Sequence, residues 1–429
     1  MCTFGRRGQG NPTSAQRSDC QQSLLVEHTL YEGLRAVIVQ GIRYDTGQPA
    51  RVTIEQGRVR FVAARVPETT LATRLPWLVP GLLDIQVNGY GGQEFASADL
   101  TEEKVRTIAE QLLHFGVTRF CPTLTTQPPE VFDKALSVIA RACESDPWLR
   151  QAIVGIHLEG PFLSPEDGAR GAHPREWCQP PDWELFCRWQ EKAGGRIRLV
   201  TLAPELPGAT DFIEKVAARG VIVGIGHTMA NSQQIRAAVE AGARLSTHLG
   251  NGCPAQMHRH HNPIWPQLAE DRLIASFIAD GHHLPAPVLK SMIRAKGPSR
   301  SVLISDLSGQ AGQPPGVYRS PFCDVEILPD GRLVVPGQRE YLAGASAPLL
   351  RGVAIARAYV GVDWAVAFAM ASKNPATLLG LSEDWLREGE PPNFLVVGLQ
   401  EASDENPIPE IVLREVVFSD QRTAVGSAT

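Results

Sequence analysis

The sequence predicts an α/β protein, a TIM (β/α)8 barrel with a small β-sandwich domain formed from both termini. The central part of the chain alternates apolar strand-like runs with helical patterns, which is typical of βαβ units and a parallel sheet. Shorter strand-like runs occupy both ends of the chain. The central runs match the strand number of a TIM barrel, and they cover residues 82–88, 117–122, 152–157, 198–203, 220–226, 243–248, 273–279 and 301–305.

Helices are expected between these runs, because apolar residues recur there at helical spacing. The clearest helical patterns cover residues 102–115, 129–143, 212–219 and 232–241. Asp99 followed by Glu102 resembles a capping box at the start of the first of them.

The terminal regions are expected to fold apart from the barrel. Residues 1–23 are polar and lack the apolar stretch of a secretory signal, so we expect a disordered tail. Residues 24–79 contain several strand-like runs, and Gln56-Gly57 between two of them is typical of a tight hairpin turn. Residues 386–429 are again rich in strand-like runs and should complete the small β domain. The barrel then occupies residues 80–385.

Composition narrows the classes of function. The net charge of −5 provides no basic surface for nucleic acid or for an anionic membrane. No apolar run approaches the length of a membrane span, so no membrane partner is expected. The 8 cysteines are scattered without a CxxC pair, which indicates reduced thiols and a cytoplasmic location.

Four strand-like runs end in side chains that can bind a metal or move a proton. The third run leads into His-Leu-Glu-Gly-Pro and delivers Glu159, the fifth delivers His227, the sixth delivers His248 and the eighth delivers Asp306. A TIM barrel carries its chemistry at the carboxyl ends of its strands, so these side chains should meet. One carboxylate and two imidazoles, with a position left open for water, are typical ligands of a catalytic divalent metal.

Each of these residues also has a purely structural interpretation. A single buried histidine is more often a hydrogen-bonded core residue than a ligand. Asp306 could cap a helix or form an ion pair at the barrel mouth. The four residues together favour a metallohydrolase in which Asp306 acts as general base and acid.

The first strand carries Gln86 and Asn88 near its end. Amides are poor ligands for transition metals, so we expect one divalent metal ion per chain rather than two. Zinc is the metal we expect, while iron, manganese and cobalt accept the same ligands. The segment 258–261, which contains Arg259 among three histidines, could hold an anion or form a solvated loop.

The order of these motifs resembles the N-acetylglucosamine-6-phosphate deacetylase family of the amidohydrolase superfamily over about residues 30–400. The shared motifs are Pro80-Gly81-Leu82-Leu83-Asp84, Gln86-Val87-Asn88-Gly89, His157-Leu158-Glu159-Gly160-Pro161, Gly171-Ala172-His173, Leu202-Ala203-Pro204-Glu205, Gly226-His227-Thr228, Thr247-His248-Leu249 with Asn251, Ala279-Asp280-Gly281 with His283, and Ser305-Asp306.

The resemblance implies a role for each matching residue. Asp306 would activate water and His173 would help to polarise the acetyl carbonyl. Gln86 and Asn88 match the variant of the family that keeps a single metal. The metal ligands would be Glu159, His227 and His248, and the phosphosugar contacts would be Asn251, Arg259 and His283, with Arg259 at the position of the phosphate-binding arginine.

The expected function is therefore a metal-dependent deacetylase that converts N-acetylglucosamine 6-phosphate to glucosamine 6-phosphate and acetate. Its partners would be a small amino-sugar substrate and a second copy of the chain in a homodimer. Two alternatives remain open. The residues after Arg259 depart from the family pattern, which allows an amidohydrolase that acts on an unphosphorylated N-acyl substrate. A catalytically silent barrel is the other alternative, although such a protein would be expected to lose the ligands or the base.

Overall fold

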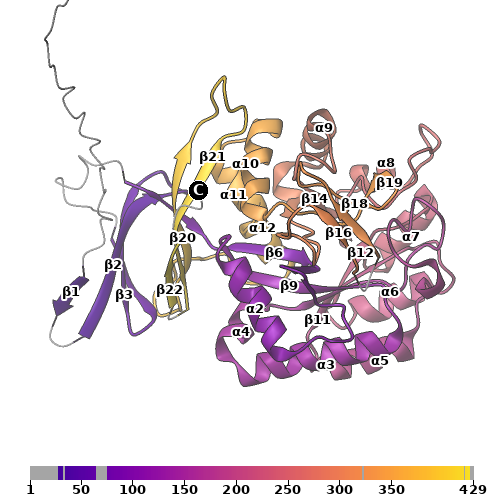
Figure 1. Ribbon diagram of the computed structural model, residues 1–429, viewed down its shortest axis with the longest axis horizontal. Helices are drawn as coiled ribbons and strands as arrows, with labels where there is room; N and C mark the ends of the chain where they lie inside the picture. The colour runs from indigo at the N-terminus through magenta and orange to yellow at the C-terminus, as the bar shows by residue number, and fades with distance from the viewer. Residues whose placement is uncertain (1–27, 32–33, 64–74, 321–322, 420, 426–429) are drawn as a thin grey trace, which may run out of the picture.

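The computed structural model describes residues 28–31, 34–63, 75–320, 323–419 and 421–425 of the chain. The predicted tail, residues 1–23, lies outside these ranges. Two sheets of eight strands organise the fold, one in the barrel and one beside it (Figure 1). Among the described residues, no helix is both long enough and apolar enough to cross a lipid bilayer.

The barrel sheet is parallel and confirms the predicted TIM barrel. Each strand pairs with the next in chain order, and hydrogen bonds from Asn88 N to Leu307 O (2.9 Å) and from Asp306 N to Gln86 O (3.0 Å) join the last strand to the first. The strands are β6 (Leu82–Val87), β9 (Val117–Thr125), β10 (Ile156–Glu159), β11 (Ile197–Leu202), β12 (Ile222–Ile225), β13 (Leu245–Ser246), β14 (Ile274–Ile278) and β15 (Ser301–Ile304).

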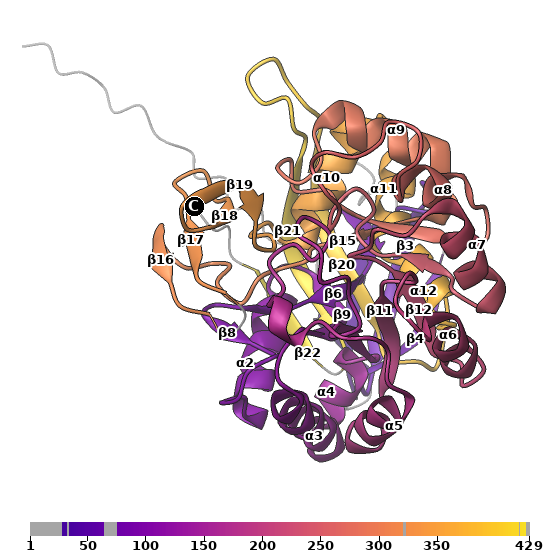
Figure 2. The same ribbon diagram turned by 90° about the vertical axis from the view of Figure 1, so that its right-hand side faces the viewer.

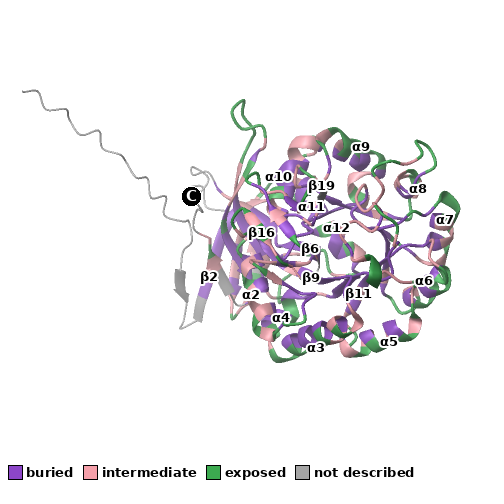
Figure 3. Cartoon of the chain, turned by 45° about the vertical axis from the view of Figure 1, so that its right-hand side comes forward, coloured by how far each residue is buried: buried purple, intermediate pink, exposed green. Residues whose placement is uncertain are grey.

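Helices surround this barrel, as Figure 2 shows in a view onto the carboxyl ends of the strands. Figure 3 shows the barrel strands as buried, while exposed residues gather on the outer faces of the helices. The described α-helices are α2 (Glu102–Leu113), α3 (Pro129–Ser145), α4 (Pro147–Ala152), α5 (Trp183–Lys192), α6 (Ala209–Ala217), α7 (Ser232–Ala241), α8 (Ile264–Ala269), α9 (Ala286–Lys296), α10 (Leu349–Val360), α11 (Trp364–Met370) and α12 (Lys373–Leu378). Short 3-10 helices cover Arg175–Trp177 and Pro298–Arg300.

Two local predictions are wrong. The residue that caps α2 is Thr101, whose side chain accepts a hydrogen bond from Lys104 N, whereas Asp99 forms an ion pair with Lys104 (2.6 Å). The third strand begins at Ile156 rather than at residue 152. The apolar run contains the end of α4, which Asp146 caps by accepting hydrogen bonds from two backbone amides. Glu159 is consequently the last residue of β10.

The strands of both termini form one mixed sheet in the order β22-β21-β20-β5-β2-β3-β4, with β1 paired to β2. This arrangement confirms a small β domain built from both ends of the chain, as a single hydrogen-bonded sheet. Gln56 and Gly57 form the predicted hairpin turn, with φ of 53° and 69°. The strands are β1 (His28–Tyr31), β2 (Leu34–Arg43), β3 (Pro49–Glu55), β4 (Arg58–Ala63), β5 (Trp77–Pro80), β20 (Asn393–Gln400), β21 (Glu410–Phe418) and β22 (Gln421–Ala424).

The chain passes from the terminal sheet into the barrel at Gly81, which separates β5 from β6. Its backbone lies so close to the Asn393 and Thr118 side chains that an added Cβ would approach Asn393 Oδ1 to 2.1 Å. β6 therefore starts beside the terminal sheet and carries its carboxyl end away from it (Figure 1). We propose that the two domains divide near residues 80 and 385.

A small antiparallel sheet between β15 and α10 was not predicted. It consists of β16 (Gly316–Tyr318), β17 (Val325–Ile327), β18 (Leu333–Val335) and β19 (Gln338–Leu342). Asp330-Gly331 between two apolar runs is the hairpin signal that could have revealed it. The buried carboxylate of Glu94, in the hairpin of β7 (Gly89–Tyr90) and β8 (Gln93–Glu94), accepts a hydrogen bond from Ser320 Oγ (2.6 Å) and links this region to the barrel.

Glu94 should make the stability of the fold depend on pH. Burial raises the pKa of its carboxyl from 4.5 to about 7, so the folded state keeps the proton to higher pH than the unfolded state does. Its contribution is complete below the unfolded pKa and is lost as the pH rises through about 7, at a cost of roughly 3 kcal/mol. Urea unfolding at pH 5 and pH 8 measures the effect. The free energy of unfolding should fall less between pH 5 and pH 8 in Glu94→Gln than in the wild type. An equal loss in both proteins would contradict this role.

Candidate metal centre and substrate cavity

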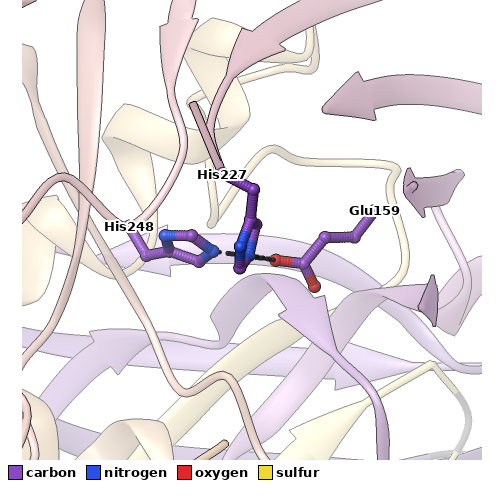
Figure 4. A group of neighbouring side chains, drawn as sticks. All are labelled: Glu159, His227 and His248. Carbon is purple, nitrogen blue, oxygen red and sulfur yellow. Dashed lines mark hydrogen bonds and ion pairs between the residues drawn. The ribbon is translucent and has the colours of Figure 1, made fainter. Parts of the chain in front are cut away.

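The predicted site residues from four barrel strands meet at the carboxyl end of the barrel. Glu159 ends β10, His227 and His248 follow β12 and β13, and Asp306 follows β15. All four side chains are buried. Figure 4 shows both imidazoles turned toward the carboxylate of Glu159, whose Oε1 lies 2.8 Å from His248 Nε2 and 3.2 Å from His227 Nε2.

The backbone is unusual at three of these residues. His227, His248 and Asp306 have φ of 50°, 32° and 54°, in the left-handed region that residues other than glycine seldom adopt. Each costs on the order of 1–2 kcal/mol relative to ordinary backbone. The extended strand ends at these positions, and the surrounding barrel holds the conformation because the neighbouring residues are fixed in the parallel sheet.

The donor set fits a divalent metal. One ligand atom from each of Glu159, His227 and His248 lies within 4.8 Å of the others. His227 Nδ1 lies 2.9 Å from the carbonyl oxygen of Ala169, to which it donates, so Nε2 is the ring nitrogen that faces the metal group. Glu159 Oε1 and the two Nε2 atoms therefore face one another, as three ligands of one metal ion do.

The electrostatics of Glu159 agree with this fit. Burial alone would raise the pKa of its carboxyl, but the hydrogen bonds and charges of His227 and His248 outweigh burial and hold the pKa well below its usual value. Glu159 is therefore an anion at neutral pH, as a metal ligand must be.

Asp306 differs from Glu159 because its environment favours the protonated form. Burial, reinforced by the negative charge of Glu159, raises the pKa of the Asp306 carboxyl. Gln86 Nε2 (3.2 Å) and Asn88 Nδ2 (2.9 Å) both donate to Asp306 Oδ1. The two amides therefore orient the carboxylate, and Oδ2 remains available to accept a proton.

Asp84 supports Asp306 from below and was not predicted as a site residue. Its carboxylate is fully buried and accepts hydrogen bonds from Ser305 N (3.2 Å to each oxygen) and Gln86 N (3.3 Å). It therefore joins the first barrel strand to the last, directly before Gln86 and Asp306. A lone carboxylate inside the apolar run 82–87 was the available signal, because a buried acid needs partners.

The loop after Glu159 approaches the β9 end closely. Gly160 has a φ of 108°, and a Cβ there would lie 2.1 Å from Thr126 Oγ1. The same hydroxyl lies 2.8 Å from His173 Nδ1 and so fixes the imidazole of the buried His173. Burial, together with the neighbouring His227, lowers the pKa of His173 well below its usual value, so its ring is neutral.

These residues surround a cavity of about 310 Å³. Asn251 and His283 lie in its wall, and Asp280 Oδ2 is 2.7 Å from His283 Nδ1, which holds that ring in place. The unpredicted insertion contributes Leu342 and Gly344. The predicted residues that line the cavity are Asn88, Glu159, His173, His227, His248, Asn251, His283 and Asp306.

Two predicted residues do not line this cavity. Gln86 lies beneath it and reaches it only through Asp306. Arg259 is exposed, and its carbonyl oxygen accepts a hydrogen bond from Trp265 Nε1 (2.8 Å). Its loop is held by local contacts, such as those of Asn262 Nδ2 with the carbonyl oxygens of His258 (2.9 Å) and Arg259 (3.4 Å).

Residues 77–425 match the model of the amidohydrolase family. The chain is 33% identical over 338 residues to N-acetylglucosamine-6-phosphate deacetylase of Bacillus subtilis, covering 77% of this chain and 83% of the relative. It is 35% identical over 335 residues to the human deacetylase of the same name, covering 75% of this chain and 79% of the relative.

A solved structure of N-acetyl-D-glucosamine-6-phosphate deacetylase from Mycobacterium smegmatis superposes with a TM-score of 0.78 at 28% identity, covering 90% of this chain and all of the other. A variant of that enzyme was solved in complex with N-acetyl-D-glucosamine-6-phosphate, and it superposes with a TM-score of 0.77. An enamidase of the amidohydrolase superfamily, at 13% identity and a TM-score of 0.54, shares the fold.

Proposed function

The chain belongs to the amidohydrolase family and, within it, to the N-acetylglucosamine-6-phosphate deacetylases, and from this premise we propose that it hydrolyses N-acetylglucosamine 6-phosphate to glucosamine 6-phosphate and acetate. The observation that carries the proposal is the buried group of Glu159, His227 and His248 with Asp306 at the same cavity. A metal-binding group beside a general base is the arrangement that a hydrolase needs to attack an amide with water.

We propose that Glu159, His227 and His248 hold one divalent metal ion per chain, and that the metal is zinc. Bound there, the metal would polarise the amide carbonyl and make water more acidic. Gln86 and Asn88 support a single metal, because their amide nitrogens donate to Asp306 and amides are poor ligands for transition metals.

The side chains divide the proton transfers between them. Asp306 takes a proton from the attacking water and returns it to the departing amine, a sequence that suits a carboxyl whose pKa is raised. We assign the Thr126 hydroxyl as the donor to His173 Nδ1, 2.8 Å away, which places the ring proton at Nε2. His173 can then donate a hydrogen bond to the acetyl carbonyl oxygen as negative charge develops on it.

Asn251 and His283 support recognition of the sugar from the cavity wall. We assign Arg259 to the phosphate, as the resemblance implies.

We propose that the protein is a homodimer. Exposed Trp265, held to the Arg259 carbonyl, offers apolar surface near this arginine that a second copy could cover. Among the described residues, 6 cysteines are free thiols, which supports a reducing, cytoplasmic location.

A second candidate function is deacetylation of an unphosphorylated amino sugar. The exposed position of Arg259, outside the cavity, favours it. Acetate release from matched pairs of N-acetyl sugars, with and without the 6-phosphate, separates the two. Preference for the phosphosugar supports the first function. Equal or better turnover of the unphosphorylated sugar replaces it with the second, and no acetate from any of them refutes both.

Arg259→Ala should raise the Michaelis constant for the phosphosugar and leave that for the unphosphorylated sugar almost unchanged. A guanidinium can hold a phosphate through two charge-assisted hydrogen bonds, worth about 1.5–3 kcal/mol each. Steady-state kinetics on both substrates measure the difference. Arg272→Ala is a control, because this exposed arginine pairs with Glu270 instead. Equal weakening of both substrates by Arg259→Ala would contradict the role.

A further inference from the structure

A second cavity lies at the opposite end of the barrel from the metal centre. It measures about 420 Å³ and is lined by Arg119 of β9, by residues of α12 and the terminal sheet, and by the segment 382–392 that joins them. Figure 1 shows these elements meeting where the barrel faces the terminal sheet. None of the residues that line this cavity lines the cavity of the metal centre.

Arg119, in β9, places a charge at this second cavity. It lies two residues before Cys121, whose side chain belongs to the apolar cluster inside the barrel, so Arg119 shares that face of the strand. Its Nε is buried and has no hydrogen-bond partner. Among the described residues, the guanidinium of Arg119 has no hydrogen bond and no ion pair.

An unpaired guanidinium in this position is costly. Burial lowers the pKa of Arg119, with no acid to oppose the effect, yet an arginine remains charged at neutral pH. Arg119 as a whole is partly buried, but its buried Nε–H without a partner carries a desolvation cost of about 1–3 kcal/mol. An anion from solution, bound in the adjoining cavity, would provide the missing partner.

The walls of the cavity indicate what kind of anion fits. Tyr44, Trp385 and Phe418 supply aromatic surface, and prolines 80, 391 and 392 add rigid apolar surface. The lining also contains Glu383, Asp384 and Glu390, of which Glu383 is paired with Lys373 (3.1 Å). These acids disfavour a multiply charged ligand, whereas a singly charged one with an apolar body suits both the walls and Arg119.

We propose that this cavity is a second small-molecule site, which binds a small organic carboxylate through the Arg119 guanidinium. The inference is independent of the deacetylase reaction, because it uses none of the residues of the metal centre. A bidentate pair between guanidinium and carboxylate would give the buried Nε–H its partner, and the aromatic walls would cover the apolar part of the ligand.

Benzoate is a suitable probe, and benzamide is its neutral counterpart of the same shape. Added to the metal-loaded protein, benzoate should raise the temperature of unfolding and benzamide should not. Arg119→Gln should bind benzoate at least tenfold more weakly in calorimetry and lose the thermal shift. Arg51→Gln is the matched control, because Arg51 also has a buried Nε without a partner but lies outside this cavity. Asp306→Asn should keep the shift, which separates this site from the metal centre.

Without any anion, Arg119→Gln should unfold at the same or a higher temperature than the wild type, because it removes an uncompensated charge. If it fails to fold, Arg119→Lys should keep part of the benzoate shift, and a crystal of the wild type grown with benzoate should show the ligand beside Arg119. The proposal is overturned if benzoate does not stabilise the wild type, if benzamide does so equally, or if Arg119→Gln retains the shift.

Discussion

Asp306→Asn should bind the metal normally and lower kcat by about a hundredfold or more, the usual contribution of a positioned general base. The amide has nearly the same shape, and asparagine tolerates the left-handed backbone that Asp306 adopts. Its oxygen can still accept from Gln86 and Asn88, as Asp306 Oδ1 does now. The group that is lost is the one oxygen able to take a proton from water.

The measurement is kcat for acetate release together with the metal content of the same sample. Glu94→Gln is the control, because Glu94 is a buried acid with a raised pKa that does not line the metal-centre cavity. It should keep kcat near the wild-type value. Near-normal turnover in Asp306→Asn would remove this residue from the mechanism, and loss of metal from that variant would reassign it to metal binding.

Removal of the metal should abolish turnover, and the loaded protein should contain one equivalent per chain. Polarisation of the carbonyl and activation of water by a metal contribute several kcal/mol, so the loss should exceed about a thousandfold. Glu159→Gln should have the same effect, because a neutral amide replaces the anionic ligand between His227 and His248.

Elemental analysis and turnover after dialysis against a chelator test both parts. Glu166→Gln makes the same substitution at an exposed position outside the metal group and should retain metal and activity. Two equivalents of metal per wild-type chain would show that Gln86 or Asn88 helps to hold a second ion. Full activity after complete removal of the metal would refute the proposed chemistry.

The sequence predicted the barrel and the meeting of the four site residues at its carboxyl end, because both depend on local patterns. An apolar run that ends in a polar residue identifies a buried strand and its end, and a parallel barrel brings those ends together. Glu159, His227, His248 and Asp306 follow directly from that rule. The start of β10 did not, because the end of α4 is as apolar as the strand that follows it.

The surroundings of the metal group were harder to predict, since they depend on contacts between segments far apart in the chain. The support from Asp84 to Ser305 joins residues 221 positions apart. The insertion that brings Leu342 to the cavity consists of strands of only 3–5 residues, too short for a clear periodic signal. The position of Arg259 depends on turns in its own loop, which the order of motifs does not determine.

The left-handed backbone of His227, His248 and Asp306 lowers the stability of the fold at the positions that the proposed activity needs. Glycine would relieve the local strain at each position and could make the folded protein more resistant to heat, while removing a ligand or the base. A screen that rewards heat resistance alone would therefore tend to erase the site. Engineering of this chain for industrial temperatures should hold these three positions constant and seek its gains elsewhere.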